Sequence, residues 1–168
     1  MSGRLSRFVV VGAALGVGLA VAGTGALAHN THGETATTPG ARAALARHDN
    51  FEKVGATFKR LNDELRKGDP DKAVLTQSAG QLKTYASQLP TWFPRGSGQE
   101  ARPKSEAKAN IWSDAAGFTA AASNLQVQTS KLQQLAQAGD VDALKAQVRA
   151  TGGACKGCHD KYRVPKES

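Results

Sequence analysis

Residues 140–165 read DVDALKAQVRATGGACKGCHDKYRVP, and this stretch predicts an amphipathic helix with cysteine and histidine side chains near its end. Asp140 is a favourable N-cap residue, and Pro165 cannot continue a helix. Gly152-Gly153 weakens the helix locally, by about 1 kcal/mol per glycine relative to alanine. The apolar positions recur at helical spacing and lead to the cysteines: Val141, Leu144, Val148 and, after the motif, Tyr162.

The segment Cys155-Lys156-Gly157-Cys158-His159 is the C-x-x-C-H signature of covalent haem attachment. On a helix, residues three and four positions apart share a face. Two thiols at this spacing can form thioethers with the two vinyl groups at one haem edge, and the adjacent imidazole can reach the iron. Gly157 removes a side chain where the macrocycle must come close. The motif therefore predicts one haem c, bound through Cys155 and Cys158, with His159 as iron ligand.

Three other chemistries use a close cysteine pair. A redox-active C-x-x-C belongs on a βαβ scaffold, and this chain shows no strand pattern. A zinc site needs four ligands, and the remaining histidines, His29, His32 and His48, are poorly placed to complete a tetrahedron. A local disulfide followed by a histidine is the simplest alternative. Because the chain has only these two cysteines, no disulfide framework crosses the core.

Two amphipathic helices are predicted between residues 38 and 90. Thr38-Pro39 supplies an N-cap and a first-turn proline, and Gly68 supplies a stop. Asp69-Pro70 starts the next helix, and Pro90 ends it. The apolar stripes are Leu45, Phe51, Val54, Phe58, Leu61 and Leu65 in the first helix and Val74, Ser78, Leu82, Tyr85 and Leu89 in the second.

Residues 90–104, PTWFPRGSGQEARPK, hold three prolines and two glycines and are predicted to form the one long loop. Ser105 can cap a third helix that stops at Gly139. Together with helix 140–165, these segments predict an all-α fold, an antiparallel up-down-up-down four-helix bundle. Only 5% of the residues are aromatic, so a covalently attached haem would fill much of the core. The third stripe is Ile111, Ala115, Phe118, Ala122, Leu125, Thr129, Leu132 and Leu135.

The first 28 residues have the pattern of a cleaved signal peptide. Arg4 and Arg7 precede an apolar run that closes with Ala26-Leu27-Ala28, an A-x-A cleavage sequence. An uncleaved membrane anchor is the alternative, since the run approaches the length of a bilayer span. We predict export to the periplasm, a flexible leader at residues 29–40 and a four-helix domain at residues 41–168, with no membrane attachment after cleavage.

The formal net charge is +8 for the whole chain. Without Arg4 and Arg7 the 22 basic residues become 20 against 14 acidic ones, which gives +6. These charges are mixed along the helices rather than gathered on one face with aromatic residues, so we predict no nucleic-acid binding. A weakly basic surface of this kind would instead steer an acidic partner.

The sixth iron ligand would decide the chemistry of a haem at this motif. Methionine is the usual distal ligand of electron-transfer cytochromes, and the only methionine, Met1, would leave with the signal peptide. A histidine–methionine haem is therefore not expected once the signal peptide is cleaved. His48 is the one histidine on a predicted core helix and stays open as an alternative ligand, although its neighbours Arg47 and Asp49 favour the surface or the haem edge.

Several short segments point to a known family. They are the C-x-x-C-H motif with the residues after it, Asp160 to Arg163, and the segments Phe93-Pro94, Gly96-Ser97-Gly98 and Ile111-Trp112, with Phe118 six positions on. With these elements the chain resembles the class II c-type cytochromes, and specifically the cytochrome c′ family, over residues 41–163.

The resemblance implies roles for further residues. Arg47 and His48 match an Arg-Gln pair that lies near the haem propionates in the family, with histidine replacing the commoner glutamine. Phe51 matches the position that faces the distal side of the iron, where cytochromes c′ often carry an apolar residue. Arg163 matches a basic residue beside the proximal face that affects the potential of the site. Trp112 would flank the haem, and ordinary core packing explains it equally well.

The resemblance also implies a function. We expect a periplasmic, pentacoordinate, high-spin haem protein that binds nitric oxide and carbon monoxide and exchanges one electron with an unidentified periplasmic redox partner. The alternative is a six-coordinate, low-spin electron carrier with His48 as distal ligand. Enzymatic activity of the peroxidase kind is not expected, because the distal positions offer no acid–base pair. Members of the family often dimerise through their first two helices, so the resemblance allows a homodimer.

Overall fold

The computed structural model describes residues 36–165, and these form five α-helices and one short 3₁₀-helix. The predicted signal peptide and residues 29–35 of the predicted leader lie outside the described residues. In chain order the elements are α1 (Pro39–Leu65), α2 (Lys72–Gln88), η1 (Leu89–Trp92), α3 (Asn110–Ser113), α4 (Ala115–Ala138) and α5 (Val141–Tyr162).

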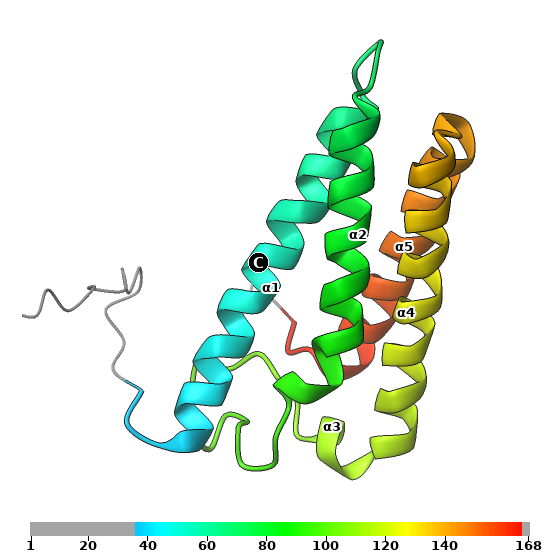
Figure 1. The fold of residues 1–168 in the computed structure, drawn as a ribbon. Helices are drawn as coiled ribbons and strands as arrows, with labels where there is room; N and C mark the ends of the chain where they lie inside the picture. Colours follow the sequence, from blue (N-terminus) through cyan, green and yellow to red (C-terminus); the bar gives the residue numbers. More distant parts are fainter. Residues whose placement is uncertain (1–35, 166–168) are drawn as a thin grey trace, which may run out of the picture. The chain divides into compact units, whose positions relative to one another are not determined.

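Four long helices form the predicted bundle (Figure 1). Helix α1 packs against α2, α2 against α4, and α4 against α5, which is the antiparallel order expected from short connections. The segment between η1 and α3 crosses one end of the bundle, the end at which α1 begins and α5 finishes (Figure 1). The all-α four-helix prediction is confirmed. None of the described helices combines the length and apolar composition that a bilayer span requires.

The predicted helix caps at three positions are confirmed. Thr38 Oγ1 accepts the backbone N–H of Ala41 at 3.1 Å, so α1 begins at Pro39, two residues inside the stretch predicted as leader. Asp140 Oδ1 accepts the N–H of Ala143 at 3.0 Å at the start of α5. Gly139 adopts φ +79°, a left-handed conformation that favours glycine and ends α4.

Two helix starts differ from the prediction. Helix α2 is capped by Asp71, whose carboxylate accepts the N–H of Ala73 at 2.7 Å, and not by Asp69. The predicted third helix is interrupted: a short α3 precedes Asp114, and the long α4 starts after it. Ser105 caps no helix: α3 begins only at Asn110, and the Ser105 hydroxyl accepts hydrogen bonds from the N–H of Ala107 and from Arg47. Asp114 takes over as N-cap by accepting the N–H of Gly117 at 3.1 Å.

The stop of the first helix also falls earlier than predicted. Helix α1 ends at Leu65, three residues before Gly68. The N–H groups of Arg66 and Lys67 donate to the carbonyls of Asp63 and Glu64, which tightens the last turn before Gly68 is reached.

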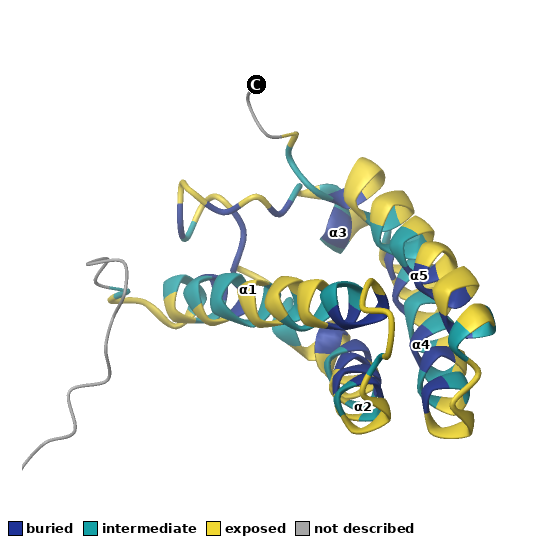
Figure 2. Cartoon of the chain, turned by 90° about the horizontal axis from the view of Figure 1, so that it is seen from above, coloured by how far each residue is buried: buried dark blue, intermediate teal, exposed yellow. Residues whose placement is uncertain are grey.

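The core has two parts. Figure 2 colours the buried positions of the helices and loops dark blue. The leucine cluster fills the bundle and consists of Leu61, Leu65, Leu75, Ala79, Leu82, Leu132, Ala136, Leu144 and Val148. The aromatic cluster lies where α5 ends and is built on Leu89, Ala107, Ile111, Phe118, Ala122 and Tyr162. Partly buried side chains complete the aromatic cluster: Phe51, Trp92, Phe93, Trp112, Ala121, Leu125 and Cys158.

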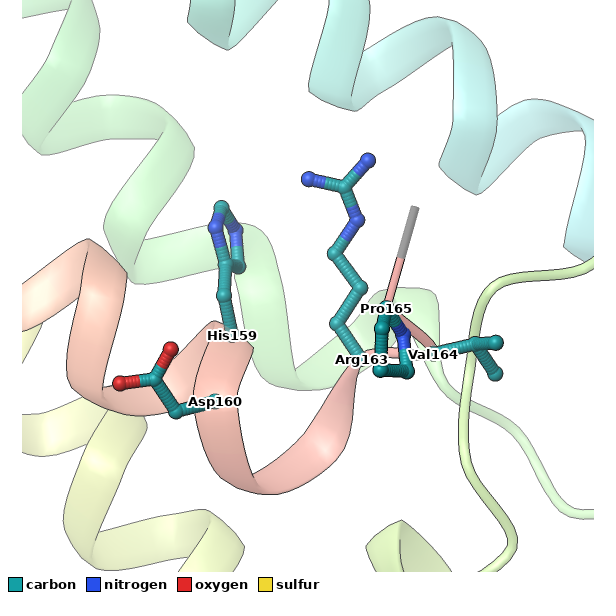
Figure 3. A pocket seen from close by; sticks show the side chains of 5 residues that line it. All are labelled: His159, Asp160, Arg163, Val164 and Pro165. Atoms are coloured by element: carbon teal, nitrogen blue, oxygen red, sulfur yellow. The ribbon is translucent and has the colours of Figure 1, made fainter. Parts of the chain in front are cut away.

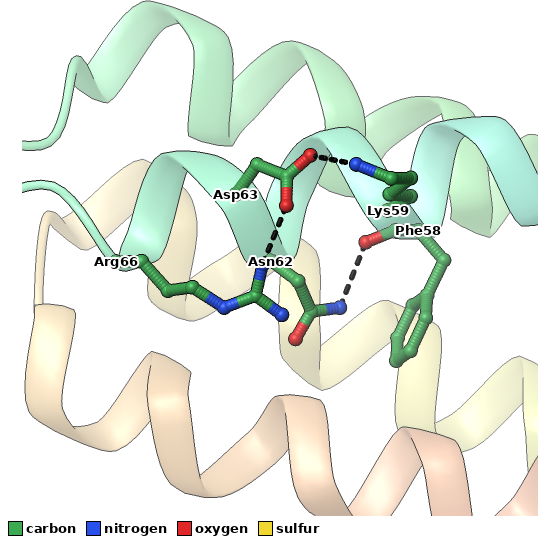
Figure 4. Close-up of polar contacts among 5 residues, drawn as sticks. All are labelled: Phe58, Lys59, Asn62, Asp63 and Arg66. Atoms are coloured by element: carbon green, nitrogen blue, oxygen red, sulfur yellow. Dashed lines mark hydrogen bonds and ion pairs between the residues drawn. The ribbon is translucent and has the colours of Figure 1, made fainter.

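The solvent-facing side of α1 carries short-range ion pairs (Figure 4). Asp63 pairs with Lys59 at 2.6 Å and with Arg66 at 2.5 Å, and both cations are more than 70% exposed. Exposed pairs of this kind add little stability. They show that basic and acidic side chains alternate on this face of α1.

Candidate haem site

Helix α5 carries the attachment motif in its last turns. Cys155 and Cys158 are both free and half-buried, and Cys158 packs against the aromatic cluster. Burial raises the pKa of both thiols, and the charge of Cys155 raises that of Cys158 further. Both side chains are therefore uncharged thiols at neutral pH, one helical turn apart beside apolar surface. This arrangement suits attachment to the apolar edge of a macrocycle.

His159 lines a pocket of about 300 Å³ at the end of α5 (Figure 3). The other lining residues are Asp160, Arg163, Val164 and Pro165, and the side chains of His159 and Arg163 project from the helix end in the same direction. Partial burial lowers the pKa of His159, the positive charge of Arg163 lowers it further, and Glu106 and Asp160 oppose the shift. A neutral imidazole is the form that binds a metal.

The segment that follows His159 is fixed to the loop before α3. Arg163 donates through Nε to Glu106 Oε2 at 2.8 Å, and its Nη2 lies 2.7 Å from the same oxygen. The backbone of Val164 donates to the carbonyl of Glu106 at 2.8 Å, and that of Lys108 donates to the carbonyl of Tyr162 at 3.0 Å. These contacts hold the Arg163 guanidinium beside the pocket.

A second set of contacts joins α5 to the start of α4. The Tyr162 hydroxyl donates to Asp114 Oδ2 at 2.8 Å, and Lys161 Nζ lies 2.6 Å from the same atom. The hydrogen bond from Lys161 is the largest reason that the pKa of Asp114 falls to about 2, followed by those from Tyr162 and the N–H of Gly117. The end of α5 is therefore positioned by the cap of α4.

Phe51 on α1 packs against the aromatic cluster, which Cys158 on α5 also contacts. Its ring packs edge-on against Trp92, with centroids 5.4 Å apart, and lies 6.2 Å from the ring of Phe93. Trp112 joins the cluster from α3, and its indole N–H donates to the carbonyl of Phe93 at 3.0 Å. The structure thus brings Phe51, Trp112 and Cys158 to one apolar region.

His48 lies apart from this region. Its side chain is 38% exposed, and Nε2 lies 3.4 Å from Oε1 of Glu52, one turn further along α1. His48 therefore contacts its neighbour on α1, and it is not part of the aromatic cluster.

Arg47 is buried, with 5% of its surface exposed. Its guanidinium donates to the carbonyl of Trp92 and to the hydroxyls of Ser97 and Ser105. Its only predicted contact, with haem propionates, came from the family resemblance. These loop partners were not predicted, because they lie 45 to 58 residues away in the sequence. Glu106 and Asp114 were also not foreseen, because their roles depend on contacts across the fold.

The residues present fit a covalently held haem. Two thiols and an imidazole occupy positions i, i+3 and i+4 of one helix, and an uncharged aromatic surface lies next to Cys158. A four-helix bundle with C-x-x-C-H in the last turns of its final helix is, by fold and site, a c-type cytochrome of the four-helix kind.

The comparisons with known proteins agree with that class. The sequence model of the Cytochrome C′ family matches residues 42–163, so the chain belongs to the cytochrome c′ family. A cytochrome c′ of Rubrivivax gelatinosus is 48% identical over 118 residues, which cover 70% of this chain and 90% of the relative.

Solved structures show the same fold. The crystal structure of cytochrome c′ from Rubrivivax gelatinosus superposes with a TM-score of 0.63 and 35% identity, covering 72% of this chain and 94% of that one. A ferrous variant of cytochrome c prime from Alcaligenes xylosoxidans with bound NO superposes with a TM-score of 0.68 and 30% identity, covering 79% of this chain and all of the other.

Proposed function

We propose that this protein is exported to the periplasm by cleavage of residues 1–28, holds one haem c through Cys155 and Cys158, and binds nitric oxide and carbon monoxide at an iron whose only protein ligand is His159. The single observation that carries this proposal is the position of Phe51. An aromatic ring that cannot ligate a metal lies in the apolar region that also contains Cys158. The bound haem supplies an iron atom that takes a diatomic gas and changes between the ferric and ferrous states.

The proximal residues hold and tune the iron ligand. His159 offers a neutral imidazole, since partial burial and the charge of Arg163 lower its pKa. Arg163 itself is held by Glu106, so the positive charge stays beside the pocket at a defined place. A fixed charge next to a redox centre shifts its potential, because the two oxidation states differ by one unit of charge.

The distal residues restrict what can bind. The Phe51 ring packs against Trp92 and Phe93 in the apolar region that also contains Cys158, where it would exclude water from a bound haem. A small uncharged gas would then have to displace this ring to reach the iron. Phenylalanine donates no hydrogen bond, so dioxygen gains little there, and its ring supplies neither an acid nor a base for peroxidase chemistry. Support for the gas ligand comes from the relative of known structure with bound NO.

The alternative, a six-coordinate electron carrier with His48 as distal ligand, has less support. His48 pairs with Glu52 at 3.4 Å and is partly exposed, whereas Phe51 packs toward the bundle. One-electron exchange with an acidic periplasmic partner remains part of the proposal, since any c-type haem can change oxidation state. A homodimer through α1 and α2 is proposed from the family resemblance alone.

The absorption spectrum of the reduced protein, recorded with and without carbon monoxide, tests this function. We expect the ferrous protein to form a carbon monoxide complex at once, with no slow phase for loss of an existing ligand. A reduced spectrum that does not change under carbon monoxide contradicts the proposal.

A further inference from the structure

One arginine on α1 contacts both ends of the loop that carries the distal aromatic residues. Arg47 Nη1 donates to the carbonyl of Trp92 at 3.2 Å and to Ser97 Oγ at 2.9 Å. Arg47 Nη2 donates to the carbonyl of Ser97 at 2.6 Å and to Ser105 Oγ at 2.9 Å. Residues 92–105, called here the aromatic loop, are therefore joined at their start, middle and end to a single guanidinium.

The same guanidinium lies against the aromatic side chains. Arg47 Cζ is 4.8 Å from the centroid of the Phe93 ring, a cation–π distance. Phe51 lies one turn further along α1 and packs on Trp92 and Phe93, the residues on which Arg47 acts. Arg47 thus fixes the surface that supports the Phe51 ring.

A buried, charged arginine side chain needs several hydrogen-bond acceptors. Burial lowers the pKa of Arg47 to about 10, with the nearby charge of Arg102 acting in the same direction and that of Glu100 opposing. The side chain still carries its charge at neutral pH, and an unpaired buried charge is strongly destabilising. Four hydrogen bonds to loop acceptors compensate for that cost. The planar guanidinium can contact acceptors in several directions at once, which an ammonium group cannot.

Two further contacts fix the aromatic loop independently of Arg47. Trp112 Nε1 donates to the carbonyl of Phe93 at 3.0 Å. The first turn of α1 lies directly on the loop, since a Cβ at Gly40 would come within 2.0 Å of the carbonyl oxygen of Gly96. Because of these contacts, a substitution that removes one Arg47 partner is expected to loosen the loop and not to unfold it.

We propose that Arg47 is a positioning residue for gas binding: it holds the aromatic loop so that Trp92 and Phe93 restrain the Phe51 ring, and thereby sets how fast a diatomic gas reaches the iron. This role rests on the proposed function. It differs from contact with the haem propionates, the role that the family resemblance implies, because its acceptors are atoms of the chain itself.

The rate of carbon monoxide association with the reduced holoprotein tests the role. The variants are Arg47→Lys, Ser105→Ala and the double variant, with Arg42→Lys as control on the same helix, where the arginine is exposed and donates to the carbonyl of Thr37. We expect Arg47→Lys and Ser105→Ala each to speed association about fivefold, equivalent to about 1 kcal/mol, and Arg42→Lys to leave it unchanged. The double variant should exceed the larger single effect by little, because both substitutions remove the same hydrogen bond, the one between Arg47 and Ser105.

Two more measurements separate this role from a propionate contact. Near-ultraviolet circular dichroism should change in both single variants, because Trp92 and Phe93 lose their fixed packing. The reduction potential should stay near that of the wild type in Ser105→Ala. If Arg47 instead acts on a propionate through its charge, Ser105→Ala should match the wild type in association rate, circular dichroism and reduction potential. Arg47→Lys should then keep the wild-type association rate, and this pair of results would overturn the positioning role.

The failure of the role and the failure of the proposed function give different results. A wild type that binds carbon monoxide at a rate unchanged in both variants overturns the positioning role alone. A reduced wild type that binds no carbon monoxide overturns the proposed function and the positioning role with it.

Discussion

At the scale of single residues, the attachment motif combines two uncharged thiols with a neutral imidazole. Partial burial acts on all three side chains in the direction that favours the uncharged form. The motif therefore presents uncharged groups beside the apolar surface that Cys158 contacts.

The first prediction concerns covalent attachment through Cys155 and Cys158. Denaturation in acid and organic solvent should leave the haem on the polypeptide, since two thioethers hold it. Either Cys155→Ala or Cys158→Ala should reduce the yield of haem-containing protein to a minor fraction, measured by haem staining of a denaturing gel. Haem that passes entirely into the organic phase from the wild type would refute this assignment.

The second prediction concerns the charges beside His159. Removing a positive charge stabilises the ferric state, which carries one more positive charge than the ferrous state, so Arg163→Ala should lower the reduction potential. The effect should be on the order of 1 kcal/mol, because the side chain is one-third exposed and screened. Glu106→Gln should raise the potential, and Arg149→Ala, further back on α5, should not change it. A potential that rises in Arg163→Ala would show that this guanidinium does not act on the proximal side.

At the scale of helices and loops, α1 carries two kinds of apolar position. Val54 packs against the leucine cluster, whereas Phe51 packs against the aromatic cluster. One helix therefore contributes to both clusters. If Phe51 covers the haem as proposed, substitutions at the two positions should separate stability from gas access.

The third prediction follows from that separation. Phe51→Ala should speed carbon monoxide association, because it removes the ring that a gas must displace. It should lower the free energy of unfolding by about 2 kcal/mol. This is less than the loss expected when alanine replaces a fully buried phenylalanine, because Phe51 is only half-buried. Val54→Ala is the matched control and should lower stability without changing the association rate. Equal rates for wild type and Phe51→Ala would place the distal site elsewhere.

The fourth prediction concerns Asp114, which caps α4 and accepts hydrogen bonds from the end of α5. The pKa of its carboxyl falls from its ordinary value of 3.8 to about 2, so its ionised form stabilises the native state. This contribution is fully present above pH 4 and is lost as the pH falls through about 2. Asp114→Asn should therefore lower the denaturant midpoint at pH 7, and the difference from wild type should shrink at acid pH.

A substitution at an exposed acidic residue provides the control for that measurement. Asp142 is 98% exposed in the first turn of α5, and Asp142→Asn should leave the midpoint nearly unchanged at both pH values. A difference between wild type and Asp114→Asn that grows as the pH falls would contradict the proposed cap and anchor.

At the scale of the whole molecule, the bundle was predictable because its helices carry periodic apolar stripes and local stop and cap residues. The proposed haem-binding residues Cys155, Cys158 and His159 could be selected from the sequence because the motif is local. The break at Asp114 was missed, since it depends on Tyr162 and Lys161 from another helix. The loop contacts of Arg47 were missed for the same reason: their partners lie 45 to 58 residues away in the sequence.

The central claim is that the haem iron has one protein ligand and that Phe51 covers its other face. The spin state of the purified ferrous protein, measured by absorption and magnetic circular dichroism in wild type and His48→Ala, tests it most directly. The account predicts a high-spin spectrum that is the same in both proteins. A low-spin wild type that becomes high-spin in His48→Ala would contradict the account and would establish a haem with two histidine ligands.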